Sequence, residues 1–290
     1  MTKIYILIPI YNDWESVSKL INEINFCIKD LDAEFSIMVI NDASKNHQNL
    51  NLENTDSLKN IKIINMKENK GHARCIAAGL KYIHEKKDYD YIIPMDGDGE
   101  DRPEEIIEFT NQIKKFTNKP IVGKRVKRTE KLIFKICYEL HKLITFTFTG
   151  KSIKFGNFTC LPKSTVEKMT NEKATWNSFS GSLIKLEKDL IEIPSTRGVR
   201  YFGPSKMSFF NLIKHSLSII SVFRRTVLIR SALFIVVYIL LIKSNASILT
   251  SMPLLLLLIM IYSVSSLALR ENMDEFDQAL SNIDNIDTVK

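Results

Sequence analysis

The segment at residues 95–103, Met-Asp-Gly-Asp-Gly-Glu-Asp-Arg-Pro, places four acidic side chains within six positions. Carboxylates packed this closely repel one another, so a compensating cation or a special local arrangement is expected. Asp96 and Asp98 flank a single glycine, and carboxylate oxygens are preferred ligands of Mg²⁺ and Mn²⁺. An EF-hand calcium loop is excluded, because its glycine and glutamate positions would fall on Asp101 and Ile107. The segment alone leaves two interpretations, a metal site and a solvated acidic turn.

Apolar runs rich in Ile and Val recur through the first part of the chain. They occupy residues 3–10, 35–41, 61–66, 89–95 and 119–123. Each run is continuously apolar rather than alternating, which is typical of parallel strands covered on both faces. Helical patterns lie between the runs, so the sequence predicts an open α/β sheet.

Polar, small or acidic residues follow each of the first four predicted strands. These segments are residues 9–13, 41–44, 67–74 and 96–101. Ligands of open α/β sheets bind beyond the carboxyl ends of the strands, so we expect the four segments to converge on one site. This placement favours the metal site over the solvated turn. The next helix is expected to have Pro103 in its first turn and Asp101 as its N-cap.

The composition changes near residue 226, where the chain becomes almost uncharged. Residues 226–242 carry a single charge, Arg230, and residues 248–269 carry none. About 20 apolar residues span the hydrocarbon core, so the sequence predicts a transmembrane hairpin with helices at 226–243 and 248–269. A pair of buried core helices is the alternative. Basic residues flank the hairpin, which predicts a multi-pass membrane protein with its large amino-terminal domain in the cytoplasm.

The predicted organisation has four parts. They are an α/β domain at residues 1–205, an amphipathic juxtamembrane helix at 206–225, the hairpin at 226–270 and a solvated acidic cytoplasmic tail at 271–290. The basic run at 114–142 is also amphipathic, so both amphipathic segments are expected to contact anionic membrane lipid. Solvated helices packed on the sheet are the alternative for these two segments.

Composition also excludes some classes of protein. The net charge of +7 is modest and the sequence contains no recognisable nucleic-acid-binding module, so no nucleic-acid partner is expected. The four cysteines lie far apart and form no C-x-x-C pair, which is typical of a reduced, cytoplasm-facing protein.

The segments Pro-Ile-Tyr-Asn-Asp (9–13), Ile-Asn-Asp-Ala-Ser (40–44), Asn-Lys-Gly-His-Ala-Arg (69–74) and Met-Asp-Gly-Asp-Gly-Glu-Asp (95–101) resemble the successive signatures of family 2 glycosyltransferases. The resemblance covers roughly residues 1–205 and implies the GT-A fold, a Rossmann-like, mostly parallel sheet domain. The run from Arg197 to Lys206 and the two-helix carboxyl end narrow it to polyprenyl-phosphate glycosyltransferases, relatives of dolichyl-phosphate mannose synthase. It implies an inverting enzyme that moves a hexose from UDP- or GDP-hexose to a polyprenyl phosphate at the cytoplasmic membrane face.

The resemblance also implies roles for individual residues. The expected nucleotide-sugar residues are Pro9, Tyr11, Asn12, Asp13, Asp42, Gly71, Arg74 and Asp96. The expected Mg²⁺ or Mn²⁺ site consists of Asp96, Asp98 and Glu100, with Asp98 as the direct ligand. Arg125, Arg197, Arg200 and Lys206 are expected to neutralise the acceptor phosphate, and with Asp96 and Asp98 they form the expected catalytic set. Simpler roles stay open for some: helix capping for Asn12 or Asp13, core packing for Tyr11, a helix start for Gly71 and a solvated helix face for Arg74.

Position 157 separates the hypotheses about the acceptor. Many relatives have Gly-Asp-Phe-Arg where this chain has Gly-Asn-Phe-Thr at residues 156–159. Asn157 cannot take a proton, whereas a hydroxyl acceptor needs a general base. A phosphate monoester is already largely ionised near pH 7 and needs only positioning and charge neutralisation.

Two alternatives to the phosphate acceptor stay open. The first is a glycosyltransferase acting on a glycan or lipid hydroxyl, with Glu167 or Glu172 as its base. The second is a non-catalytic nucleotide-binding membrane partner. The sugar, the base and the oligomeric state stay open too, with a homo-oligomer among the expectations.

Overall fold

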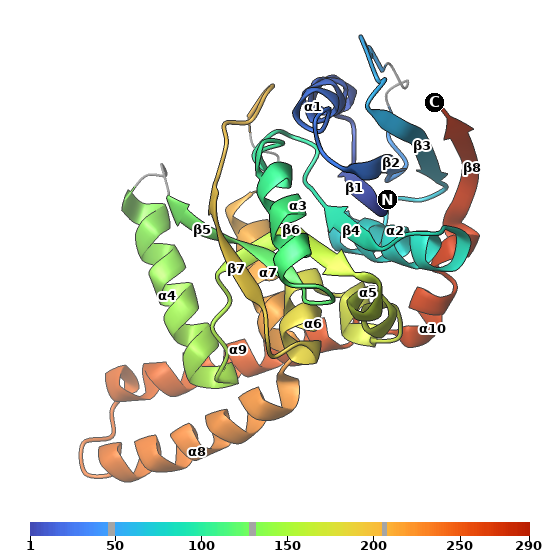
Figure 1. The fold of residues 1–290 in the computed structure, drawn as a ribbon. Helices are drawn as coiled ribbons and strands as arrows, with labels where there is room; N and C mark the ends of the chain where they lie inside the picture. The colour runs from blue at the N-terminus through green and yellow to red at the C-terminus, as the bar shows by residue number, and fades with distance from the viewer. Residues whose placement is uncertain (46–49, 128–131, 205–207) are drawn as a thin grey trace.

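A mixed eight-stranded sheet forms the centre of the molecule (Figure 1). A computed structural model of the chain describes residues 1–45, 50–127, 132–204 and 208–290. The strand order is β7-β5-β6-β4-β1-β2-β3-β8. The predicted α/β class is confirmed, and the sheet is mostly parallel around its first strands.

Four parallel strands build the part of the sheet that carries the site. They are β1 (Thr2–Ile10), β2 (Ala33–Asn41), β3 (Leu58–Met66) and β4 (Tyr91–Pro94). Ile6 of β1 lies in register with Ile37 of β2 and Ile93 of β4. These side chains are fully buried, because helices cover both faces of the sheet. The continuous apolar runs therefore predicted these strands correctly.

The remaining strands make the sheet mixed. β5 (Ile121–Lys127) pairs in parallel with β7 (Ile191–Thr196), while β6 (Phe155–Pro162) runs antiparallel between β4 and β5. The sequence predicted part of β5 but neither β6 nor β7. Polar residues interrupt both of the missed strands, which hides their apolar pattern.

Helices cover the two faces of the sheet and form two separate cores. One face packs against α1 (Trp14–Cys27) and α3 (Glu105–Lys115). The other packs against α2 (His72–Lys86), α5 (Lys163–Thr170) and α6 (Phe179–Leu186). Helix α2 lies so close to β1 that a Cβ atom at Gly79 would overlap the Leu7 side chain.

The start of α3 differs from the prediction. The helix begins at Glu105 with Glu104 at the N-cap position. Asp101 is buried, and its Oδ2 accepts a hydrogen bond from the Asp96 backbone N–H at 2.9 Å. The assignment of Asp101 as the N-cap was therefore wrong, because this carboxyl group instead closes the turn that carries Asp96.

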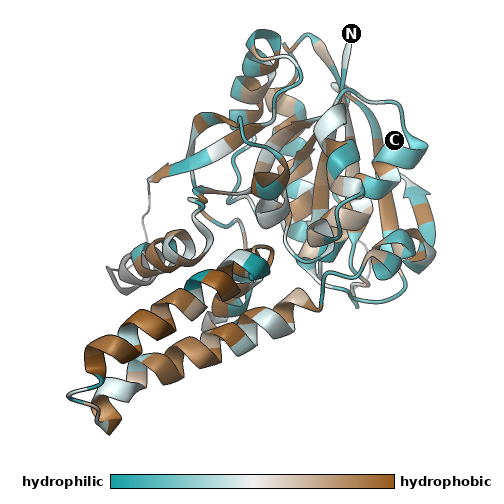
Figure 2. Cartoon of the chain, turned by 90° about the horizontal axis from the view of Figure 1, so that it is seen from below, coloured by the Kyte–Doolittle hydropathy of each residue, from teal (hydrophilic) through white to brown (hydrophobic). Residues whose placement is uncertain are grey.

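The apolar carboxyl-terminal helices form an antiparallel pair that projects from the domain (Figure 2). Helix α7 (Phe209–Ser221) leads into α8 (Arg224–Ile242), which is followed by α9 (Ile248–Ala268). Both α8 and α9 are long and apolar enough to cross a membrane, and about a tenth of each is buried in the protein. Helix α4 (Leu132–Thr149) packs beside them, and Arg230 of α8 donates to the carbonyl oxygen of Thr147 at 2.8 Å.

The two predicted amphipathic segments correspond to different structures. The basic run at 114–142 is divided between the end of α3, β5 and α4, with residues 128–131 outside the described part. The juxtamembrane helix at 206–225 corresponds to α7 and the first residues of α8, and residues 205–207 are likewise not described.

The last residues return to the sheet. After α9 the chain forms α10 (Met273–Asp277), a 3-10 helix (Ala279–Asn282) and β8 (Ile283–Thr288). Strand β8 pairs antiparallel with β3 at the edge of the sheet, and Phe276 is fully buried. The prediction of a solvated tail at 271–290 was therefore wrong, because this segment supplies a strand and a core side chain.

Candidate functional site

The acidic residues singled out in the sequence gather at one edge of the sheet. Strands β1, β2 and β4 are adjacent and parallel, so their carboxyl ends share that edge. Asp13 follows β1, Asp42 follows β2, and Asp96 and Asp98 follow β4. The expected convergence of these strand ends is what the sheet produces.

Asp42 organises the loop that follows β3. It is 4% exposed, and its two carboxylate oxygens accept the backbone N–H groups of Lys70 at 2.8 Å and Gly71 at 2.9 Å. Gly71 has a φ of +92°, in the region that favours glycine, and precedes α2. Asp42 therefore fixes the loop at residues 67–71 above the sheet edge.

The segment after β1 forms a second wall of the site. Pro9 is buried within β1, and Tyr11 beyond it is 39% exposed. The Asn12 backbone N–H donates to Ser44 Oγ at 2.9 Å, while Asn12 Oδ1 accepts the Lys45 N–H at 2.8 Å. These bonds tie the end of β1 to the end of β2. The partly exposed Tyr11 ring does not have the core-packing role that was open for it.

Asp96 contacts two side chains from other elements. Its Oδ1 lies 3.2 Å from His72 Nε2, at the start of α2, and 3.4 Å from Asn157 Nδ2 on β6. The same Asn157 amide lies 2.9 Å from His72 Nε2. His72, Asn157 and Asp96 thus form one polar cluster. Asp96 is the first carboxylate of the Asp-Gly-Asp sequence at residues 96–98, called the D-x-D pattern below.

Asp98 contacts the segment between β7 and α7. Arg200 Nη1 lies 2.7 Å from Asp98 Oδ2, and Arg200 Nη2 forms an ion pair with Asp13. Arg197 forms an ion pair with Glu100. Two backbone bonds support these contacts, from Tyr201 N–H to Asp98 O at 2.9 Å and from Gly198 N–H to Glu100 O at 2.8 Å.

The glycines of the acidic segment allow this close approach. Gly99 has a φ of +85°, and a Cβ atom there would overlap the Tyr201 ring. A Cβ atom at Gly198 would come 2.6 Å from the Gly99 carbonyl oxygen. Residues 197–201 therefore lie directly against the turn that carries Asp98.

Burial and neighbouring charges shift the pKa values of these acids in different directions. Burial alone would raise the pKa of Asp96, but the charges of His72 and Arg125 hold it well below its usual range. Burial and the Asp96 charge raise the pKa of Asp98, against the lowering effect of Arg200. Burial and Asp96 also raise the pKa of Asp101 to about 8. Asp96 is thus kept ionised, while its buried neighbour Asp101 favours the protonated form.

Two carboxylates at this edge suit a hard divalent cation. Mg²⁺ and Mn²⁺ retain several waters and need only one or two protein carboxylates, and Asp96 and Asp98 are the expected pair. The Glu100 carboxylate forms an ion pair with Arg197, so it already has a cationic partner in this structure. In the described part of the chain, no three His, Cys, Asp or Glu side chains gather in a metal-binding group. The residues fit a site with two protein ligands better than the expected set of three.

The basic residues assigned to the acceptor lie in different surroundings. Arg125 on β5 has its guanidinium against Gly156 of β6, and its charge acts on both Asp96 and Asp101. Arg197 contacts Glu100 and Arg200 contacts Asp98, so both arginines lie against the acidic segment at residues 95–101. Lys206 lies outside the described residues.

Arg74 faces the carboxyl-terminal segment. Its Nη2 lies 3.0 Å from Glu275 Oε2, and its guanidinium lies 5.1 Å from the ring centroid of Trp176. The solvated helix face considered for Arg74 is excluded, because its side chain is 16% exposed. In this structure the guanidinium pairs with the segment that follows α9.

Two residues that the sequence interpretation passed over lie in the site. His72 was not among the expected site residues, yet it contacts Asp96. Tyr201 packs over Gly99 and its hydroxyl donates to Glu23. His72 could have been found, because it directly follows Gly71 in a segment already expected at the sheet edge. Tyr201 could have been found because it directly follows Arg200, inside the run from Arg197 to Lys206.

Comparison with known families decides the class of the protein. The family model described as Glycosyl transferase family 2 matches residues 5–166, more than half of the chain. The chain belongs to glycosyl transferase family 2. This family 2 glycosyltransferase has all four strand-end segments within the matched region, and the resemblance read from them is confirmed at the level of the family.

Solved structures share the fold of this glycosyltransferase. Glucosyl-3-phosphoglycerate synthase from Mycobacterium tuberculosis, solved with Mn²⁺, UDP-glucose and phosphoglyceric acid, has a TM-score of 0.56 at 10% identity, over 78% of this chain and 80% of that one. The same enzyme with Mg²⁺ and UDP gives 0.52 at 11% identity, over 78% and 79%. TarS from S. aureus gives 0.52 at 12% identity, over 97% of this chain and 54% of that one. At these identities the likeness establishes the fold.

Proposed function

We propose that this glycosyltransferase moves a hexose from a nucleotide sugar to a polyprenyl phosphate at the cytoplasmic face of a membrane, with inversion at the anomeric carbon. The donor expectation is supported by the strand-end acids and by the UDP-glucose and Mn²⁺ bound to a structural neighbour. A divalent cation held by Asp96 and Asp98 would stabilise the negative charge of the departing diphosphate.

Position 157 carries the acceptor proposal. Asn157 lies beside Asp96, and an amide there cannot remove a proton from a hydroxyl. A phosphate monoester attacks through an oxygen that is already ionised, so the chain needs only to hold it and offset its charge. The positive charge of Arg125, close to Asp96, suits that task.

The bases considered for a hydroxyl acceptor are poorly placed for it. Helix α5 directly follows Pro162, which pairs with Tyr91 at the start of β4. The helix therefore begins at the amino-terminal end of β4, whereas Asp96 follows its carboxyl end. Glu167 lies on that helix. Glu172 accepts the Ala174 N–H at 3.1 Å and pairs with Lys185 at 2.9 Å. Both arrangements favour the phosphate acceptor.

The carboxyl-terminal hairpin supports a membrane location. Helices α8 and α9 consist mainly of apolar residues, and many of their side chains are exposed, which water would solvate poorly. A lipid acceptor would be reached most directly by an enzyme whose catalytic domain is attached to such a hairpin.

The full-length protein in lipid nanodiscs, given UDP- and GDP-hexoses, Mn²⁺ and undecaprenyl phosphate, tests the proposal. We expect a lipid-linked hexose by mass spectrometry, and its loss with EDTA or in Asp98→Asn. Asp189→Asn, which changes an exposed acid, is the matched control. Transfer to undecaprenol but not to its phosphate would establish the hydroxyl-acceptor alternative, and metal-independent turnover in Asp98→Asn would refute the metal assignment.

A further inference from the structure

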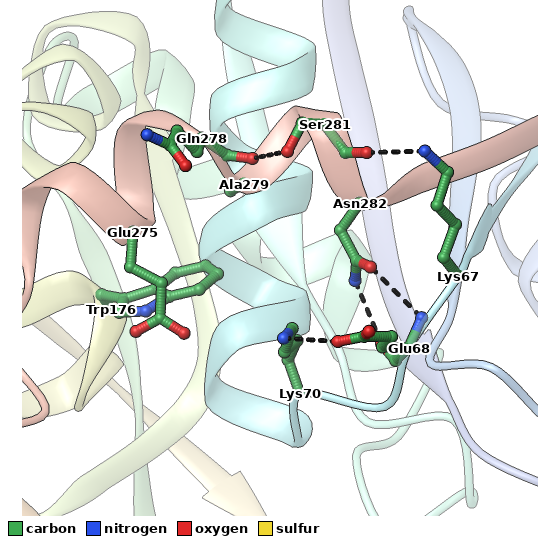
Figure 3. Close-up of a pocket in the computed structure, with 9 residues that line it drawn as sticks. All are labelled: Lys67, Glu68, Lys70, Trp176, Glu275, Gln278, Ala279, Ser281 and Asn282. Atoms are coloured by element: carbon green, nitrogen blue, oxygen red, sulfur yellow. Dashed lines mark hydrogen bonds and ion pairs between the residues drawn. The ribbon is translucent and has the colours of Figure 1, made fainter.

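The donor-side loop at residues 67–71 is held from two directions. On one side, Asp42 accepts two of its backbone N–H groups. On the other side, the Lys67 N–H donates to Asn282 O at 2.8 Å and the Glu68 N–H donates to Asn282 Oδ1 at 3.2 Å. The Asn282 amide donates back to Glu68 O at 3.0 Å (Figure 3). The Asn282 side chain thus both accepts a hydrogen bond from the Glu68 backbone and donates one to it.

Packing contributes little to this junction. A cavity of about 310 Å³ lies between the loop and the returning tail (Figure 3), and its lining includes Lys70, Trp176, Glu275 and Asn282. Because the space is not filled by side chains, the loop cannot be held there by close-packed contacts. Its position on this side therefore depends on the hydrogen bonds to Asn282 and on the bond from Lys67 Nζ to Ser281 O at 3.0 Å.

The tail that carries Asn282 is itself a firm support. Phe276 is fully buried and stacks on Trp176 with ring centroids 5.4 Å apart. Lys81 of α2 pairs with Asp277 at 2.7 Å, and its side chain is 11% exposed. Immediately after Asn282 the chain enters β8, which is hydrogen-bonded to β3. The tail is thus fixed to the domain both before and after Asn282.

The loop leads directly into the residue that contacts Asp96. Gly71 ends the loop, and the next residue is His72, whose Nε2 lies 3.2 Å from Asp96 Oδ1. A shift of Glu68 would move the backbone that presents Gly71 and His72. The connection from Asn282 to Asp96 is therefore short and continuous.

We propose that Asn282 is a positioning residue for the donor site: from the carboxyl-terminal tail, it fixes the loop that receives the nucleotide. The inference rests on the proposed use of a nucleotide-sugar donor. Loss of its side chain is expected to weaken nucleotide binding, while Asp42 still holds Lys70 and Gly71 and so limits the shift of His72.

The full-length protein with Asn282→Ala tests this role. Binding of UDP and of GDP is measured by calorimetry with Mn²⁺, together with hydrogen exchange of the loop amides and the melting temperature. The variant keeps the Asn282 carbonyl, so only the two side-chain bonds to Glu68 are lost. Asn285→Ala is the matched control, because its side chain accepts from Asn65 on β3 rather than from the loop.

For Asn282→Ala we expect faster exchange of the Glu68 amide and a Kd for the nucleotide about fivefold higher, equal to about 1 kcal/mol. In turnover assays the donor KM should rise with kcat nearly unchanged. Asn285→Ala should leave both nucleotide affinity and Glu68 exchange unchanged.

The two proposals fail in different ways. Unchanged exchange at Glu68, or equal loss of affinity in Asn285→Ala, would overturn the positioning role. Absence of UDP and GDP binding by the wild-type protein would instead overturn the proposed donor chemistry, and exchange at Glu68 would still judge whether Asn282 positions the loop.

Discussion

Arg200 Nη1 lies 2.7 Å from Asp98 Oδ2, and the same guanidinium also pairs with Asp13 at the end of β1. One cation thus joins two strand ends at the point where the D-x-D pattern presents its second carboxylate. A divalent ion held by Asp98 and this guanidinium would compete for the same carboxylate. Metal binding at Asp98 is therefore expected to compete with Arg200.

Removing the competing charge should raise metal affinity. In Arg200→Ala, Asp98 and Asp13 lose their shared partner, so we expect Mn²⁺ alone to bind on the order of tenfold more tightly, or about 1.4 kcal/mol. Isothermal calorimetry with the full-length protein measures this. Arg102→Ala removes a nearby charge that pairs with Glu104 and should change the affinity little. Equal affinity in wild type and Arg200→Ala would contradict the competition.

Gly99 should be sensitive to a single added carbon. In Gly99→Ala, both the positive φ and the overlap with Tyr201 oppose the new Cβ atom, with expected costs of about 1 kcal/mol and about 1–3 kcal/mol. Gly203 also has a positive φ, +67°, but a Cβ atom there would meet open space among the described residues. A larger loss of melting temperature in Gly99→Ala than in Gly203→Ala would isolate the packing effect. Similar losses would argue against close packing of Tyr201.

Asp101 should make the fold more stable at low pH. Burial and the charge of Asp96 raise its pKa to about 8, compared with about 3.9 in an unfolded chain. An acid whose pKa is higher in the folded state stabilises the fold fully at pH values below its unfolded pKa. This stabilisation is lost as the pH rises toward the folded pKa of about 8. In EDTA, the melting temperature of the wild type should fall from about pH 4 to pH 8 more steeply than that of Asp101→Asn. Asp56→Asn, at an exposed position, should keep the wild-type slope; a similar slope in Asp101→Asn would refute the assignment.

Phe276 should anchor the carboxyl-terminal segment. It is fully buried against Trp176, so Phe276→Ala is expected to cost about 3–5 kcal/mol in the free energy of unfolding. Ile286→Ala changes a side chain of β8 that is 39% exposed and should cost much less. Chemical denaturation compares the two variants. A near-neutral effect of Phe276→Ala would mean that the tail does not pack on the domain in solution.

The middle of α9 should tolerate charge poorly if the hairpin enters a membrane. Leu258 lies near the centre of this helix and is 54% exposed, and a lysine at the bilayer centre costs about 2.5–3.5 kcal/mol. Leu258→Lys should reduce the carbonate-resistant membrane fraction of the full-length protein. Asn245→Lys, in the turn between α8 and α9, should leave that fraction unchanged. An unaffected membrane fraction in Leu258→Lys would argue against a spanning hairpin.

Sequence patterns predicted the parallel strands and the acidic edge because both depend on local features. Ile6, Ile37 and Ile93 lie in continuous apolar runs, and the polar residues after those runs follow from parallel order alone. The fold class and the positions of Asp42, Asp96 and Asp98 were therefore within reach of the sequence.

Long-range pairings could not be read in the same way. Strand β8 lies more than two hundred residues from its partner β3, and its residues Ile-Asp-Asn-Ile-Asp-Thr (283–288) include only two apolar side chains, so the segment looks solvated in isolation. The contacts of Arg74 with Glu275 and of Arg200 with Asp98 likewise join distant segments. Only the folded sheet brings these groups together, so the partners of Arg74 and Arg200 could not be read from local motifs.

The chain enters and leaves the apolar hairpin at two places that are both secured to the catalytic domain. Before it, Asn177 binds Ser221 at 2.9 Å at the end of α7, and after it, β8 joins the sheet. A domain joined to a membrane segment by one flexible linker could reorient above a bilayer. Two attachment points instead restrict its tilt and its height above the membrane. The 21 residues of α9 would span about 31 Å, close to the thickness of a hydrocarbon core. In a membrane, the distance between the acidic edge and the lipid headgroups would then be set by the protein itself, and every acceptor would have to meet it there.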